Sequence, residues 1–158
     1  MLHITRKGDY AIRGMVYLAG RPKGAFALLD DIAAAVDVPR ALLAKVFQQF
    51  GKVGLVNSCR GAGGGFTLGR SADSISLLEI IEAVEGPILL NRCLLEEGAC
   101  GRDAVCTVHP VWREVQESMR VVLGGVSLEQ LAGKAPPARS GVPGRLHRPE
   151  DVRHHGKG

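Results

Sequence analysis

The sequence predicts a mainly α-helical protein that carries one small β-hairpin. Apolar residues recur at three- and four-residue steps in separate segments of the first 53 residues, which is the period of an amphipathic helix. A glycine-rich stretch at 60–65 then separates two short apolar runs, as in the turn of a hairpin. Helices followed by such a hairpin form the layout of a winged helix-turn-helix, whose third helix enters the major groove of DNA.

Each helix of this unit has its own signal. Thr5 can cap a first helix that extends to about residue 19, and its apolar face is formed by Tyr10, Ala11, Met15 and Leu18. A short second helix fits residues 29–35. Pro39 suits the first position of a third helix that ends near residue 53. The predicted buried stripe of the third helix consists of Leu42, Leu43, Val46, Phe47 and Phe50.

After the hairpin, Ser76 and Glu79 match a capping box that opens a helix over 77–84. A long helix is predicted over 108–123, and a short final helix begins after Ser127. The long helix carries a heptad-like apolar seam, which favours a dimer interface over packing within one chain. The seam consists of Trp112, Val115, Met119 and Val122.

Four regions follow from these elements. They are a winged helix-turn-helix domain (1–84), a cysteine-containing loop (85–109), a dimerisation helix with a short final helix (110–134), and a disordered tail rich in Pro, Gly, Arg and His (135–158).

Length and composition fit one domain with a real core, because the chain has 158 residues of which 46% are hydrophobic. No membrane span or signal peptide is evident, so we expect a cytoplasmic protein with reduced or metal-bound cysteines. The net charge is +4, with 10 Lys and Arg against 6 Asp and Glu in residues 1–80 and 5 against 2 in residues 135–158. Positive ends suit a polyanion, although ordinary surface charge gives the same pattern.

Three cysteines lie close together, at Cys93, Cys100 and Cys106, and His109 follows three residues after the last. Thiolates are the usual protein ligands of iron–sulfur clusters, and histidine can replace one of them. A structural zinc site, a dithiol switch and incidental free thiols are alternatives. A zinc site is disfavoured because no Cys-x2–4-Cys pair is present. Cys59, in the strand before the hairpin turn, fits a half-buried strand residue or a redox-sensitive thiol beside DNA.

Three segments resemble one known family. They are Thr5–Ala11, the hairpin Ser58–Gly69, and the cysteine loop with Cys106–Trp112. In this order and spacing, they are similar to the winged-helix iron–sulfur transcription regulators, the family that includes IscR and NsrR. The resemblance extends from Leu2 to about Leu131.

The resemblance implies a homodimer whose long helices cross, with Cys93, Cys100 and Cys106 as ligands of a 2Fe–2S or 4Fe–4S cluster. The fourth ligand differs between branches of the family. His109 matches the histidine of one branch, and Asp9 matches an aspartate that the partner subunit supplies in another.

The expected DNA contacts lie on the third helix and the hairpin. Ala44 replaces a glutamate that one branch uses to select its sites, and Lys45 matches a basic residue of another branch. Arg60 resembles the family's minor-groove arginine, which fits the attraction of a guanidinium to a narrow minor groove. The predicted DNA-binding residues are Arg40, Ala41, Lys45, Gln48, Arg60, Gly61, Gly63 and Gly64.

The sequence therefore predicts a homodimeric repressor that binds a double-stranded operator under control of an iron–sulfur cluster. The signal would be nitric oxide, redox state, or the supply of iron or clusters. Alternatives are a zinc-stabilised or thiol-based DNA-binding regulator and a thiol-based or electron-transfer enzyme. Enzyme function is disfavoured because the chain has no Cys-x-x-Cys pair, and its glycine run does not open a helix.

Overall fold

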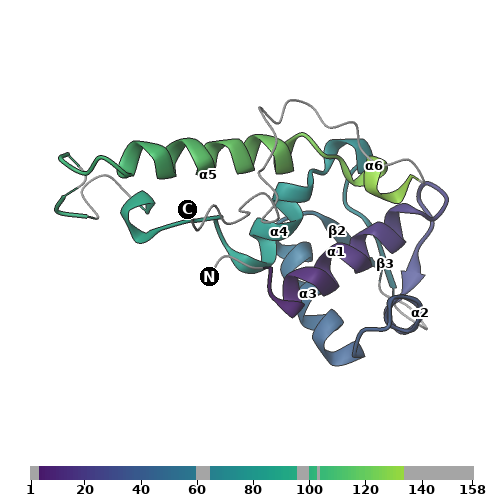
Figure 1. Cartoon of the computed structure of the whole chain (residues 1–158). Helices are drawn as coiled ribbons and strands as arrows, with labels where there is room; N and C mark the ends of the chain where they lie inside the picture. The colour runs from purple at the N-terminus through teal and green to yellow at the C-terminus, as the bar shows by residue number, and fades with distance from the viewer. Residues whose placement is uncertain (1–3, 60–64, 96–99, 103, 134–158) are drawn as a thin grey trace, which may run out of the picture.

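The structure, a computed structural model, describes residues 4–59, 65–95, 100–102 and 104–133 (Figure 1). In chain order its elements are α1 (Arg6–Ala19), β1 (Ala27–Leu28), α2 (Leu29–Val36), α3 (Arg40–Lys52), β2 (Val56–Cys59), β3 (Gly65–Leu68), the 3₁₀ turn η1 (Ala72–Ser74), α4 (Leu77–Glu85), the 3₁₀ turn η2 (Arg92–Leu94), α5 (His109–Gly124) and α6 (Leu128–Ala132). The fold is mainly α-helical with a small sheet, as predicted.

One apolar core holds the winged domain together, and Phe47 of α3 lies at its centre. The Phe47 ring meets Phe50 edge-on at 5.7 Å between centroids and meets Phe66 of β3 at 4.9 Å. Gly14 lets α1 approach α3 closely, because a Cβ atom at that position would lie 2.8 Å from Cε2 of Phe47. The orientation of α3 is therefore fixed by close packing against α1 and the sheet.

The sheet is antiparallel, in the strand order β1-β3-β2. Strands β2 and β3 form the predicted hairpin, with Val56 opposite Leu68 and Cys59 opposite Gly65. Val56 faces the core, whereas the next three residues of β2 are exposed. The hairpin thus starts at the core beside α3, and β2 becomes exposed from Asn57 to Cys59.

Side-chain caps begin three of the helices where the sequence predicts them. Thr5 caps α1, and capping boxes open α4 and α6 through the pairs Ser76–Glu79 and Ser127–Gln130. These caps satisfy backbone N–H groups of the first turn that have no partner within the helix.

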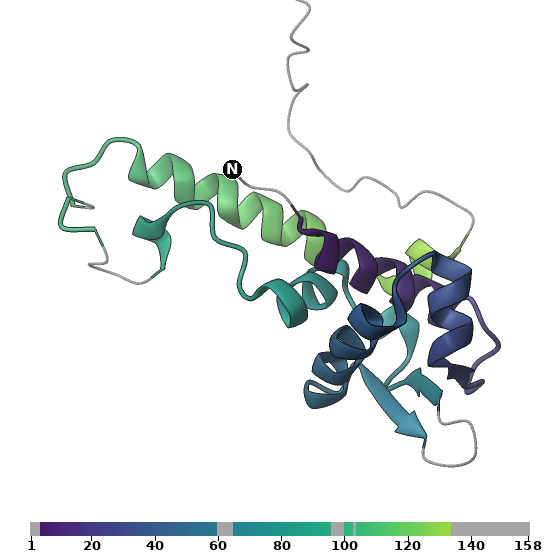
Figure 2. The ribbon, with the colours of Figure 1, turned by 90° about the horizontal axis from the view of Figure 1, so that it is seen from below.

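Helix α5 extends away from the winged domain as a long arm, and none of its residues is buried in the single chain (Figures 1 and 2). The chain then returns to the core through α6, where the side chain of Leu128 is fully buried. The Leu128 N–H donates to the Ile75 carbonyl at 2.7 Å, and the Leu77 N–H donates to the Val126 carbonyl at 2.8 Å. The winged domain therefore holds both ends of the segment that carries the cysteines. Within the described part of the chain, no helix is long and apolar enough to cross a bilayer.

The predicted helices and hairpin are confirmed to within one or two residues, with three corrections. Leu42 was predicted to be buried and is 44% exposed. Successive residues of a helix are rotated by about 100° around its axis. Leu43 lies in the middle of the buried stripe, so the side chain of Leu42 points away from the core. Strand β1 was missed because it has only two residues. Pro39 precedes α3 instead of forming its first residue. The predicted tail lies outside the described residues.

Candidate DNA interface and cysteine site

The exposed face of α3 is the first part of the candidate DNA interface. Ala41, Lys45 and Gln48 are exposed and follow one another at helical spacing, opposite the buried stripe of α3. Lys52 continues the same face one turn later and is also exposed. Lys52 is not among the predicted DNA-binding residues, although its spacing of four residues from Gln48 was a signal for it in the sequence.

Arg40 begins α3 and forms an ion pair with Asp30 of α2. The two side chains are 64% and 68% exposed. Ion pairs this exposed contribute at most about 1 kcal/mol because water screens them. The Arg40 guanidinium can therefore exchange Asp30 for a phosphate at little cost.

A groove of about 590 Å³ separates α3 from the hairpin. Its polar lining comes from Gln48 and Lys52 on α3 and from Asn57 and Ser58 on β2. Both β2 residues are exposed, and neither is among the predicted DNA-binding residues. The remaining lining residues are Phe47, Gly51, Val56 and Phe66. The predicted contacts Arg60, Gly61, Gly63 and Gly64 follow β2 directly and lie outside the described residues.

The second candidate site is a cavity of about 270 Å³ at the far end of the α5 arm. Its lining brings together all three clustered cysteines and the predicted histidine. The lining residues are Asn91, Arg92, Cys93, Cys100, Cys106, His109 and Trp112. Residues from Asn91 to Trp112 thus share one cavity, and the three thiols are half-buried.

Local structure explains how this cavity forms. Cys93 lies in η2, whose first turn is capped by the Asn91 side chain accepting from the Arg92 N–H at 2.8 Å. His109 is the first residue of α5, and its backbone N–H donates to the Cys106 carbonyl at 3.3 Å. The start of α5 therefore positions the third cysteine and the histidine together.

Three thiols and an imidazole around one cavity are a donor set able to hold an iron–sulfur cluster. Thiolates and an imidazole are its usual protein ligands, and the ligands bind different irons of one multi-atom body. Among the described residues, no group of three or more His, Cys, Asp or Glu side chains could hold a metal ion. A structural zinc ion would need four donors around one point at about 2.0–2.3 Å.

Asp9, the alternative fourth ligand, does not line the cavity of its own chain. It lies in the first turn of α1, where its carboxylate pairs with Arg13 at 2.5 Å. The structure thus groups His109 with the cysteines of the same chain and leaves Asp9 on the winged domain.

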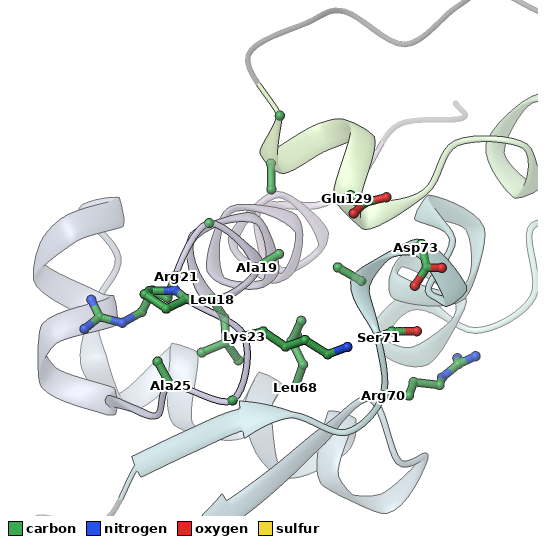
Figure 3. A pocket seen from close by; sticks show the side chains of 16 residues that line it. Leu18, Ala19, Arg21, Lys23, Ala25, Leu68, Arg70, Ser71, Asp73 and Glu129 are labelled. Atoms are coloured by element: carbon green, nitrogen blue, oxygen red, sulfur yellow. The ribbon is translucent and has the colours of Figure 1, made fainter.

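A larger cavity of about 810 Å³ lies where the end of α1, the end of β3 and α6 meet (Figure 3). Lys23 extends across it toward Ser71, and Asp73 and Glu129 add negative charge at its edge (Figure 3). It contains none of the predicted site residues. Cavity size is only a default guide to function, and here the smaller cavity contains the predicted metal ligands.

Comparison with known proteins decides the family. A family model described as "Rrf2: Iron-dependent Transcriptional regulator" matches residues 4–134. The chain belongs to the Rrf2 family. The HTH-type transcriptional regulator IscR of Xenorhabdus nematophila is 37% identical over 130 residues, which cover 82% of this chain and 79% of that protein.

Solved structures of Rrf2 regulators share the fold. CymR, the global cysteine regulator of B. subtilis, has a TM-score of 0.67 and 32% identity, covering 84% of this chain and 97% of that one. IscR of T. potens has a TM-score of 0.65 and 27% identity, covering 82% and 86%. This Rrf2 chain is accordingly a winged-helix, DNA-binding transcriptional regulator and not an enzyme, as the sequence predicted.

Proposed function

We propose that this Rrf2 regulator is a homodimeric repressor whose operator affinity is controlled by an iron–sulfur cluster. The observation that carries the proposal is the single cavity lined by Cys93, Cys100, Cys106 and His109. Its position supports a sensing role, because the cavity lies at the end of an arm, where the three thiols are only half-buried. A small oxidant or nitric oxide reaches such a site without unfolding the winged domain.

The three cysteines and His109 hold the cluster in this proposal. The bound cluster supplies iron and sulfide that react with nitric oxide or oxidants, or that are lost when iron or clusters are scarce. His109 is favoured as the fourth ligand because it shares the cavity with the thiols of its own chain. Asp9 of the partner subunit remains the alternative, since its pair with Arg13 is about half exposed and easily exchanged.

Helix α5 supplies the dimer interface. Val111, Val115 and Val122 lie on one side of it and are 54%, 40% and 39% exposed in the single chain. A run of exposed valines on a helix that its own described chain leaves uncovered is typical of a protein–protein contact. A second copy of α5 would bury this face and set the separation of the two α3 helices.

DNA binding uses α3 and the hairpin of each subunit. Lys45, Gln48 and Lys52 face the major groove, and Arg60 enters the neighbouring minor groove with backbone contacts at Gly61, Gly63 and Gly64. Asn57 and Ser58 line the groove between α3 and the hairpin and would contact the phosphate strand that passes there.

Anaerobic purification with optical and electron paramagnetic resonance spectroscopy tests the site. We expect a brown protein that loses its visible absorption in Cys93→Ala. The spectrum should change in His109→Ala and stay as in the wild type in Asp9→Ala. A wild-type spectrum in His109→Ala and a changed spectrum in Asp9→Ala would instead identify the partner's Asp9 as the fourth ligand.

Operator binding tests the regulation. A palindromic operator can be selected by the cluster-loaded protein from a random duplex library and then titrated with the loaded protein, the apo protein and Cys93→Ala. We expect both cluster-free forms to differ from the loaded protein by on the order of tenfold or more in affinity. Equal affinity in all three forms would refute cluster control.

A thiol-based or zinc-stabilised regulator is the second candidate. It is favoured by the likeness to CymR, which is described as a cysteine regulator. The four free cysteines include Cys59, which is exposed at the end of β2 beside the DNA-facing groove. A colourless protein that contains zinc, or one whose DNA affinity follows thiol oxidation without iron, would support this candidate.

A further inference from the structure

The stretch that leads from α4 into the cysteine cavity, residues 86–91, is held by side chains of α4 and α5. The Ile88 N–H donates to Oε1 of Glu82 at 3.3 Å, and the Leu90 N–H donates to Oε1 of Gln116 at 3.2 Å. Arg120 of α5 donates to the same Glu82 oxygen at 2.6 Å. Two alternate backbone N–H groups of this stretch, which we call the loop stem, are thus fixed to helices on both sides.

The side chains that hold the stem share one face of α5 with the cavity. His109, Trp112, Gln116 and Arg120 follow at steps of three, four and four residues, so they form a single stripe along the helix. The first two line the cysteine cavity, and the last two bind the stem and α4. In both views the stem lies beside α5 (Figures 1 and 2). One rigid helix face therefore connects the cavity to the winged domain.

Glu82 is the central group of this contact. Its side chain is 25% exposed, whereas those of the α1 ion pair between Asp9 and Arg13 are about half exposed. Its Oε1 atom accepts from a guanidinium and from a backbone amide. Removal of the carboxylate would leave both donors without this acceptor in a partly shielded position, which costs more than the loss of an exposed pair.

Helix α4 connects this contact to the DNA-binding part of the winged domain. Its Ile80 and Val84 side chains are buried in the core that also holds α1 and α3. At its end, Lys7 donates to the Val84 carbonyl at 2.8 Å, and Thr5 donates to the Glu85 carboxylate. A shift of the stem that moved Glu82 would therefore move α4, which is joined to α1 by these two hydrogen bonds.

We infer that Glu82, with Arg120 and Gln116, forms a set of positioning residues that couples the cysteine cavity to DNA binding. While the set is intact, the stem keeps Cys93 in place against α5, and a change at the cavity reaches α4 through the stem. The inference rests on the proposed cluster control, because it names the residues that transmit it. Glu82 is expected to fix the loop stem in the protein without a cluster as well.

Hydrogen exchange of the apo protein tests this structural role of Glu82 alone. In Glu82→Ala, we expect the Ile88 amide to exchange on the order of tenfold faster because it loses its acceptor. The Leu90 amide keeps its bond to Gln116 and should exchange faster by a smaller factor, because the neighbouring bond of the stem is lost. Glu82→Gln retains an acceptor oxygen without the charge and should give an intermediate rate. Glu117→Ala, which removes an exposed acid from another face of α5, is the matched control and should leave both amides unchanged.

Coupling is then measured as the operator affinity of the cluster-loaded protein divided by that of its Cys93→Ala variant. This ratio is determined for the wild type, for Glu82→Ala and for Glu117→Ala. We expect Glu82→Ala to bring this ratio several-fold closer to one while cluster absorbance is retained, and Glu117→Ala to leave it at the wild-type value. Arg120→Met provides a second variant, which keeps the Glu82 contact to Ile88, if Glu82→Ala does not fold.

Two results would overturn the inference: unchanged amide exchange in Glu82→Ala, or faster exchange with an unchanged ratio. A wild-type ratio of one would instead refute cluster control, and the transmitting role would fail with it. Faster exchange at Ile88 and Leu90 would even then support the structural role of Glu82, so the two failures are distinguishable.

Discussion

Gly14→Ala should destabilise the winged domain, although alanine is the better helix former. The added methyl carbon would lie 2.8 Å from Cε2 of Phe47 and 3.2 Å from Cδ1 of Leu43. Both neighbours are fully buried, and the Phe47 ring packs edge-on against Phe50 and Phe66, so turning away from the new methyl would disrupt these contacts. Forcing one extra carbon into such a core costs about 1–3 kcal/mol.

The gain in helix propensity, about 0.5–1 kcal/mol, offsets only part of this cost. We expect a net loss of about 1–2 kcal/mol, measured by urea unfolding of the apo protein as a lower midpoint with an unchanged m-value. Gly51→Ala is the matched control, since a Cβ atom at this α3 position meets nothing within 4 Å and should stabilise the protein. If Gly14→Ala were as stable as the wild type, this would refute the inference that α1 and α3 pack too closely to admit a Cβ atom at position 14.

Further predictions concern stability, pH and DNA. Leu128→Ala should cost about 2–5 kcal/mol in urea unfolding because its side chain is fully buried; a neutral effect would show that α6 is not docked. Burial raises the pKa of Glu79, but hydrogen bonds from Ser76 and Arg70 outweigh this and hold the pKa below its ordinary value. The carboxylate therefore stabilises the fold above its unfolded-state pKa and loses that contribution as the pH falls through the folded-state pKa. Because the side chain is 43% exposed, Glu79→Gln should cost only about 0.5 kcal/mol at pH 7 and nothing in acid, and a deficit that persists in acid would contradict this cause. Lys45→Ala should weaken operator binding and lower the slope of log affinity against log salt by about 0.9 if Lys45 contacts a phosphate; an unchanged slope would exclude that contact.

Much of the fold was predictable because its signals are local. Helix periods, capping residues and hairpin patterns act within a few residues, and the predicted positions of the helices and of the two hairpin strands agree with the structure. Leu42 shows the limit of the apolar pattern, since a leucine at the edge of a stripe becomes buried only if another element covers it. Strand β1 shows another limit, because its two residues form a strand only by pairing with β3.

The candidate site divides in the same way. The sequence alone identified the candidate ligands, since thiolates and an imidazole are able to bind metal wherever they lie. It also favoured an interface on the long helix, because the apolar seam of Trp112, Val115, Met119 and Val122 needs a cover. Only the tertiary structure decided that Cys93, Cys100, Cys106 and His109 share one cavity, that α6 is docked in the core, and that Glu82 joins the loop stem to α5. These are contacts between segments distant in sequence, and no local pattern encodes them because they arise only when the packed core brings those segments together.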